Sequence, residues 1–382
     1  SRGLGDVYKR QYLDNTLAAK LDRYIDTKAD ETYRELFQMY SKSVTLPMEM
    51  QTADGINTLV VDLSQFQEVG NLNNVAYPSF ADNVLTVYST MFAKEVDVIK
   101  IVGAYHTDQT PIASFSVKLS EEWEKDVYVV LENAGVYTAN EKGLIDVSAI
   151  RKKIKVTVDY IGENVVIAHD GTDSQAAQSA FVAEELEFVI TSSDSTASLK
   201  IYGGNGQDGV IEGSSGQDGA DAIIVGVLTV NTTGELYIRG GNGGNGVDGT
   251  NGSNGLDSAN SNQNGGTGYN GEGGIAGGVG GEGGSAVSAY TIVINANSAA
   301  LTLIGGDGGS GGNGGSGGNG GKGMPLGTDA NTGDSKKGGN GGNGGYGLEG
   351  TNVDMQSGSY TLKGGDAGLP GKGCLLYTSD AA

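Results

Sequence analysis

The chain has 382 residues, of which 67 are glycine, and its formal net charge is -22. This length allows two or three domains. The acidic balance, without any basic stretch, argues against nucleic acid and against an anionic membrane surface as partners. No apolar run reaches the ~20 residues of a transmembrane helix, so membrane insertion is not expected. The single cysteine, Cys374, excludes a disulfide framework.

The two ends of the chain differ from the rest. Residues 1–11 and 374–382 resemble the translated adapter read-through found at the ends of chains assembled from environmental sequencing. We expect both ends to be artefacts, which fold reasoning leaves out. On this interpretation the true N-terminus and any signal peptide lie outside the given sequence.

Residues 12–43 are expected to form a helix that serves as an attachment segment. Leu13, Leu17, Leu21 and Ile25 recur every four residues, and a similar stripe follows from Tyr33 to Tyr40. One interpretation is a short coiled coil that makes the protein a homo-oligomer. The other is an amphipathic helix packed on the next domain.

Residues 44–171 predict a β-sandwich-like domain of antiparallel strands. Short apolar runs, several alternating with polar residues, are separated by Gly, Asn, Asp or Pro. The lone Trp123 is expected to anchor the core, and residues 172–186 to form a polar linker. The strand-like runs are 58–63, 84–89, 96–102, 113–119, 127–131, 153–160 and 164–168.

Residues 187–373 form a glycine-rich repeat domain. Four segments match one another and each runs directly into Gly-Gly; they begin at Leu199, Leu236, Leu301 and Tyr360. A second strand-like run precedes each copy, at residues 188–191, 227–231, 291–295 and, more weakly, 353–356. A unit repeated at this spacing indicates a stacked or side-by-side architecture.

Between the copies the sequence repeats with a period of three. From Gly240 to Asp257, six triplets begin with Gly and end with Asn or Asp, and further runs follow Gly203, Gly265, Gly305 and Gly338. Two non-triplet spacers, 258–264 and 324–337, separate the long runs in pairs. Each long repeat therefore predicts a strand, a glycine arm out, a loop, a glycine arm back, and a strand.

Three interpretations of the triplets compete. A collagen triple helix needs glycine at every third position, but this chain has only five prolines to pre-order it. Flexible glycine-rich linker is the second. The third is a bundle of three-residue-per-turn helices that bond through their backbones. Residues 305–322 favour it: two faces are bare glycine, which allows two close neighbours, and the third carries Asp, Ser, Asn or Lys. In residues 240–257 the second face gains side chains distally, so that arm should be less enclosed near its tip.

These Gly-Gly-Asn and Gly-Gly-Ser runs with variable spacers resemble polyglycine-II proteins, such as phage long-tail-fibre tip adhesins and glycine-rich antifreeze proteins. The resemblance covers about residues 203–373. It implies that an N-terminal domain attaches the protein and that loops at the far end of the bundle contact a host receptor. The strand pairs between the arms suggest a β-solenoid or sheet base. The contact residues that this implies are Ser258, Asn260, Asn262, Gln263, Met324, Leu326, Asp329, Asn331, Lys336 and Lys337.

The sequence offers no catalytic apparatus: it has no phosphate-binding loop, no HExxH and no nucleophile elbow. Residues 203–211 fit one calcium-binding nonapeptide, but no tandem copy follows. We therefore expect a non-enzymatic protein without cofactor or metal. The first hypothesis is an adhesin at the cell surface or on a virion that binds a glycan or protein receptor. A structural spacer of a bacterial cell envelope is the alternative, and an enzyme is a distant third.

Overall fold

The computed structural model describes residues 48–64, 80–81, 83–92, 94–103, 113–139, 141–258, 269–323 and 329–373. The expected helix at residues 12–43 lies outside these ranges. So do both ends of the chain, including Cys374. In the part of the chain that is described, no helix is long and apolar enough to span a membrane.

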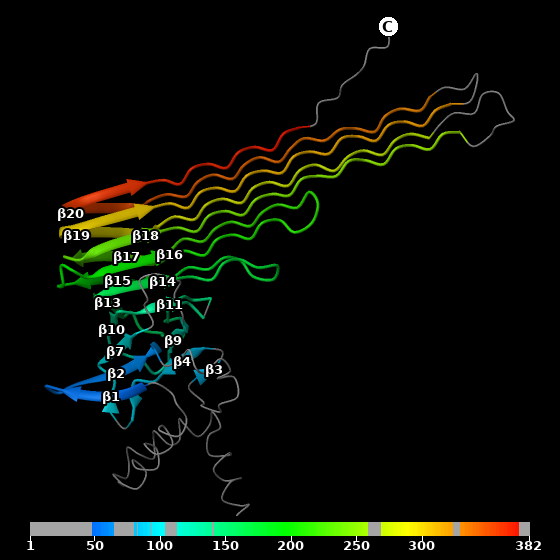
Figure 1. Ribbon diagram of the computed structural model, residues 1–382. Coiled ribbons are helices and arrows are strands. Elements are labelled where there is room, and N and C mark those ends of the chain that lie inside the picture. Colours follow the sequence, from blue (N-terminus) through cyan, green and yellow to red (C-terminus); the bar gives the residue numbers. More distant parts are fainter. Residues whose placement is uncertain are drawn as a thin grey trace, which may run out of the picture.

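The described chain is built from twenty strands (Figure 1). Every strand-like run expected between residues 58 and 168 overlaps an observed strand, which confirms that this region is β-rich. The strands are β1 (Met48–Ala53), β2 (Ile56–Asp62), β3 (Phe80–Ala81), β4 (Val84–Val87), β5 (Thr90–Met91), β6 (Lys94–Glu95), β7 (Val98–Val102), β8 (Ala113–Ser114), β9 (Ser116–Leu119), β10 (Val127–Glu132), β11 (Gly135–Tyr137), β12 (Ile145–Asp146), β13 (Lys155–Ile161), β14 (Glu163–Ile167), β15 (Phe181–Ser192), β16 (Ser198–Tyr202), β17 (Ile223–Thr232), β18 (Glu235–Arg239), β19 (Val287–Ile304) and β20 (Glu349–Lys363).

Most of these strands pair in parallel, which differs from the antiparallel sandwich expected for residues 44–171. Only the pairs β1–β2, β3–β4 and β5–β6 are antiparallel among the described strands. Strands β2, β7, β10, β13, β15, β17, β19 and β20 follow one another as parallel neighbours. The reason lies in the connections. After each strand a long crossover brings the chain back, so that the next strand runs in the same direction, whereas a tight hairpin would reverse it.

The chain repeats one coil: a strand of this first row, a turn, a strand of a second row, and a long connection. The second row is β8, β11, β14, β16 and β18, again all parallel, and β19 and β20 extend through both rows. Both rows belong to one sheet. A separate four-stranded sheet, in the order β12-β9-β4-β3, is formed by strands within the connections of the earlier coils. Residues 181–186, placed in a linker by the sequence, begin β15.

The four matching segments lie side by side, as the repeat predicted. Leu199 pairs with Leu236, Leu236 with Leu301, and Leu301 with Tyr360. The three leucines are at most 1% exposed, because equivalent side chains of successive coils stack into one core. Trp123, 1% exposed, belongs to the same core, which confirms its expected role.

From β14 onward the connections run out of the core as extended arms (Figure 1). We call residues 168–180 hairpin 1, 203–222 hairpin 2, 240–286 hairpin 3 and 305–347 hairpin 4; residues 364–373 form a final single arm. Figure 1 shows the arms running side by side away from the strands. Hairpin 2 ends well before the arms of hairpins 3 and 4.

Candidate functional site

The arms of successive hairpins are joined by backbone hydrogen bonds that repeat every three residues. We number each triplet so that Gly240, Gly241 and Asn242 occupy positions 1, 2 and 3. The N–H of position 1 donates to the carbonyl of position 3 in the same arm of the next hairpin. Gly206 donates to Asn242 at 2.7 Å, and Gly243 donates to Asp307 at 2.8 Å. These bonds stack the outgoing arms in parallel, and the returning arms likewise.

Position 2 links outgoing arms to returning arms. The N–H of Gly284 donates to the carbonyl of Gly241 within hairpin 3, and the N–H of Gly306 in hairpin 4 donates back to Gly284, both at 2.8 Å. The zigzag continues to the final arm, where Gly365 donates to Gly345. The outgoing arm of hairpin 4 thus contacts four arms, and not the two neighbours expected from its bare faces.

Position 3 uses its side chain. The Oδ1 atom of an Asn or Asp accepts the N–H of position 3 in the next hairpin. The N–H of Ser316 donates to Asn251 Oδ1 and that of Asn319 to Asn254 Oδ1, both at 2.8 Å. All three N–H groups of a triplet are then bonded, which is needed because the glycine backbone carries no internal partners. The sequence analysis treated these residues as a hydrated ridge. They are exposed along most of the arm, and they also cap the neighbouring backbone.

Glycine occupies the triplet positions at which another arm lies too close for a side chain. A Cβ added at Gly241 would overlap the carbonyl oxygen of Gly204, and one added at Gly243 would overlap that of Gly281. Hairpin 2 stops near Gly213, and beyond that point position 2 of hairpin 3 carries side chains. The second face of residues 240–257 therefore passes from buried at Gly241 to exposed at the tip, as predicted.

Only some of the expected contact residues are described: Ser258, Asp329 and Asn331 lie at the far end of the arms, and Lys336 and Lys337 lie partway along one arm. Asn260, Asn262, Gln263, Met324 and Leu326 lie outside the described ranges. The backbone of Ser258 still belongs to the arm, since its N–H donates to Lys322. Residues 329–337 are also arm and not loop: Lys336 donates to Gly315, Lys337 accepts from Gly277, and the N–H groups of Gly323 and Asn331 bond Asp329 and Asn270.

The sequence pattern did not identify residues 329–337 as part of an arm, because position 1 of these triplets is not glycine. Position 1 of the returning arm of hairpin 4 faces the final arm, and an added Cβ at Gly338 would overlap Gly371. Farther out, Asp329, Thr332 and Ser335 occupy position 1. The side chains of Asp329, Asn331, Lys336 and Lys337 are all exposed.

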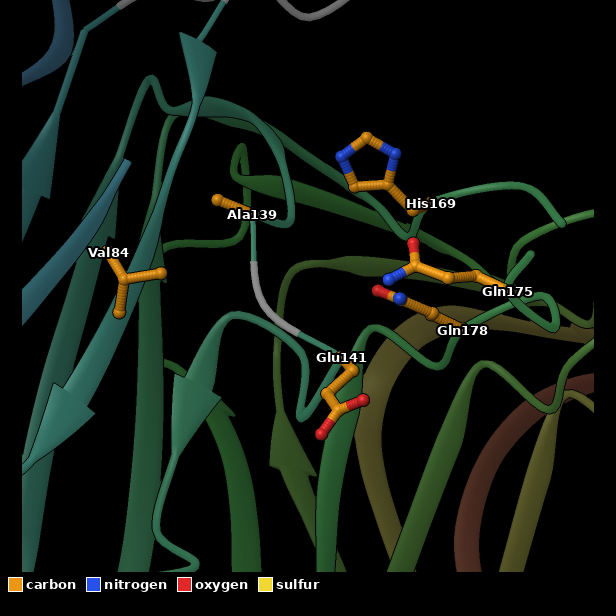
Figure 2. Close-up of a pocket in the computed structure, with 6 residues that line it drawn as sticks. All are labelled: Val84, Ala139, Glu141, His169, Gln175 and Gln178. Carbon is orange, nitrogen blue, oxygen red and sulfur yellow. The ribbon is translucent and has the colours of Figure 1, made fainter. Parts of the chain in front are cut away.

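A second candidate is a cavity of about 330 Å³ near the base of the hairpins, shown in Figure 2. Its polar lining comes from Glu141, His169, Gln175 and Gln178, and Val84 and Ala139 close another side. The two glutamine carboxamides point toward its centre (Figure 2). The side-chain oxygen of Gln178 is buried and has no hydrogen-bond partner among the described residues. These groups could hold a small polar molecule. The sequence analysis did not find them because they come from separate segments.

Burial perturbs one carboxyl group at the base of the bundle. Desolvation raises the pKa of Asp221, the nearby Glu349 raises it further, and the N–H of Ser285, 2.5 Å from Asp221 Oδ1, opposes the shift. Asp248, in contrast, accepts both the backbone N–H and the side-chain N–H of Asn313, which lowers its pKa. Within the described ranges, no three His, Cys, Asp or Glu residues gather as a metal site.

Comparison with known proteins gave no match: no family model fits the chain, and no curated protein or solved structure is similar to it.

Proposed function

We propose that the chain is a non-enzymatic adhesin of the cell-surface or tail-fibre type. In this proposal a β-solenoid carries a bundle of polyglycine-II arms, and the arms display recognition loops. The observation that supports it most directly is where the described arms end. Ser258, Tyr269, Gly323 and Asp329 end the arms of hairpins 3 and 4 at the end farthest from the strands, and backbone bonds hold those arms together.

The hydrogen bonds support the polyglycine-II part of the proposal. A helix with three residues per turn presents one N–H group of each triplet on each of three faces. The arms use the three N–H groups of a triplet in three directions, toward a parallel arm, an antiparallel arm and a capping side chain. The parallel strand coils from β13 to β20 are the corresponding support for a solenoid base.

In this proposal the partner is a host or cell-surface receptor, either a glycan or a protein, and the protein works outside the cell or on a virion. The loops need no cofactor for such a role. The segment 12–43 would attach the protein or make it an oligomer. Exposed, polar side chains such as Asp329 and Asn331 at the ends of the arms suit contacts that form and break in water.

The test compares the full chain with a variant in which residues 259–268 and 324–328 are replaced by Gly/Ser sequences of equal length. Both proteins are applied to a glycan array and to a panel of bacterial cells. We expect the parent to bind at least one surface and the variant to lose that binding with an unchanged Tm. Binding that is identical in the two proteins, or absent from the parent, would contradict the proposal.

A ligand-free spacer of a bacterial envelope is the second candidate. The observation in its favour is that backbone groups supply most bonds between arms, so the bundle could serve only to set a distance. Self-assembly of the full chain into fibres, with no binding to cells or glycans, would favour the spacer.

A further inference from the structure

Hairpin 3 extends beyond the end of hairpin 2, and the face of hairpin 3 that hairpin 2 leaves uncovered forms an apolar step. We define the apolar step as Ile211, Leu256, Tyr269 and Ile275. Ile211 lies at the tip of hairpin 2, and the other three occupy position 2 of hairpin 3. Closer to the core, position 2 faces hairpin 2, since a Cβ added at Gly244 or Gly278 would overlap its backbone. The side chains of Leu256, Tyr269 and Ile275 therefore project to the side that hairpin 2 leaves open.

These side chains are large, apolar and exposed. Ile211 is 72% exposed, Leu256 73%, Tyr269 63% and Ile275 48%. The absence of a neighbouring arm permits any residue here but does not require an apolar one. Hairpin 4 provides the comparison: beyond the described residues of the final arm, position 1 of its returning arm holds Asp329, Thr332 and Ser335, all polar. A gathered set of exposed apolar side chains indicates a surface that is covered by a partner.

The backbone of the step also has unused donors. Near the core, the N–H groups of Gly241, Gly244 and Val247 donate to carbonyls of hairpin 2. At Thr250, Ser253 and Leu256 the corresponding N–H groups have no acceptor among the described residues. The step thus resembles an open sheet edge, which an extended peptide can complete with its own carbonyls.

Hairpins 2 and 3, which carry the step, are acidic, although the Lys336 side chain of hairpin 4 lies beside Gly273. Hairpins 2 and 3 and the strands between them, residues 203–286, contain nine Asp and Glu residues and one basic residue, Arg239. Arg239 is paired with Asp307 at 2.9 Å. Glu272 occupies position 2 between Tyr269 and Ile275, so a carboxylate lies on the step itself. A partner with basic side chains would be steered to this surface.

We propose that the apolar step is the docking site for an extended segment of a partner polypeptide that carries alternating apolar and basic side chains. The apolar residues cover Leu256, Tyr269 and Ile275, the basic residues lie near Glu272, and the peptide carbonyls accept the free N–H groups. Another glycine arm is excluded, because Leu256 carries a side chain at position 2, where an added Cβ at Gly244 would already overlap the backbone of hairpin 2. A second copy of this chain is disfavoured by the net charge of -22. The proposal goes beyond the adhesin proposal and does not depend on the loops.

The test measures binding of three synthetic 12-residue peptides to the full chain by fluorescence anisotropy. One alternates Leu and Lys, one Leu and Glu, and one Ser and Lys. We expect the Leu/Lys peptide to bind at least tenfold more tightly than the other two. The double variant Leu256→Ser/Tyr269→Ser should weaken that binding at least tenfold. The matched control is Leu369→Ser/Tyr346→Ser, which removes a leucine 73% exposed and a tyrosine 64% exposed elsewhere on the bundle.

Equal loss in the two double variants would show general adhesion of the peptide and would overturn the proposal, as would no loss in either. Equal binding of the Leu/Glu peptide would overturn the assignment of a basic partner. The loop-exchanged variant described above should bind the Leu/Lys peptide as the parent does. Loss of peptide binding in that variant would refute the step and leave the adhesin proposal standing.

Discussion

The asparagine and aspartate residues at position 3 have a function that the triplet repeat alone does not reveal. Their side chains face water, yet the Oδ1 atom holds the backbone of the next arm. A signal was present in the sequence: acceptor side chains predominate where another hairpin follows, whereas the final arm carries Leu369 and Lys372 at this position. The polar character of these residues indicates that their side chains are hydrated. The hydrogen bond to the neighbouring backbone becomes visible only when the next arm is placed.

The capping bond can be tested with one substitution and a matched control. Asn254→Ala removes the acceptor of the Asn319 N–H, 2.8 Å away. We expect a loss of about 0.5–1 kcal/mol in the free energy of unfolding, because a net hydrogen bond contributes about this much. Amide exchange at Asn319 should become faster. Asn319→Ala, on an arm that no described arm follows at this point, should leave stability unchanged; an equal loss would contradict the capping role.

Asp221 predicts a pH dependence of stability. Its pKa in the folded state lies above the ordinary 3.8, so the folded state favours the protonated form. The stability gained by protonation is present at low pH and is lost as pH rises through the folded pKa. Asp221→Asn keeps an acceptor for the Ser285 N–H and removes the buried charge. We expect a higher Tm than the parent at pH 7 and no difference at pH 3. A lower Tm at pH 7 would show that the carboxylate is stabilising.

The glycine arms show which parts of the fold a sequence can predict. The phase of the repeat predicted that the second face of residues 240–257 is enclosed at the base and exposed at the tip, and this is confirmed. The four matching strand segments predicted their side-by-side pairing. Strand direction was not predictable, because short apolar runs suit parallel and antiparallel pairs alike and direction is set by the connections.

The arms also predict a contrast between two substitutions. Gly312 and Thr250 both occupy position 2, but only at Gly312 does another arm lie where the Cβ atom would be. A Cβ at Gly312 would overlap the carbonyl oxygen of Val247. We expect Gly312→Ala to lower the free energy of unfolding by about 1–3 kcal/mol through overpacking, and Thr250→Ala to change it by less than about 0.5 kcal/mol. Chemical denaturation measures both, and equal effects would refute the assignment of covered and open faces.

Across the molecule, one coil serves as the unit from which both the core and the bundle are made. The same two rows of strands recur from β13 to β20, and the connections lengthen from hairpin 1 to hairpin 3, with hairpin 4 of similar length to hairpin 3. The candidate surfaces were predictable only in part. The loop ends follow from the pairing of triplet runs, but the apolar step depends on where hairpin 2 stops in relation to hairpin 3.

This construction predicts that hairpin 4 can be lengthened in whole triplets. Insertion of Gly-Gly-Asn after Lys322 and again before Asp329 should extend the arms by ~9 Å, at ~3.1 Å per residue. The maximum dimension from small-angle X-ray scattering should grow accordingly, with an unchanged Tm. A single glycine inserted after Gly311 shifts every later triplet against its neighbours and should lower the Tm. Tolerance of that single insertion would argue against the register of the arms.

The parallel stacking of the arms has a mechanical consequence. A force that pulls on the loop of hairpin 4 acts along the arms, nearly at right angles to the bonds from position 1 to position 3. Those bonds are loaded together in shear, and hairpin 3 shares the tension before it reaches β19 and β20. If the protein is held at its N-terminal strands, a force applied to the tip of hairpin 4 is transmitted to the stacked leucine core. The load is shared by many hydrogen bonds, and no single bond carries all of it.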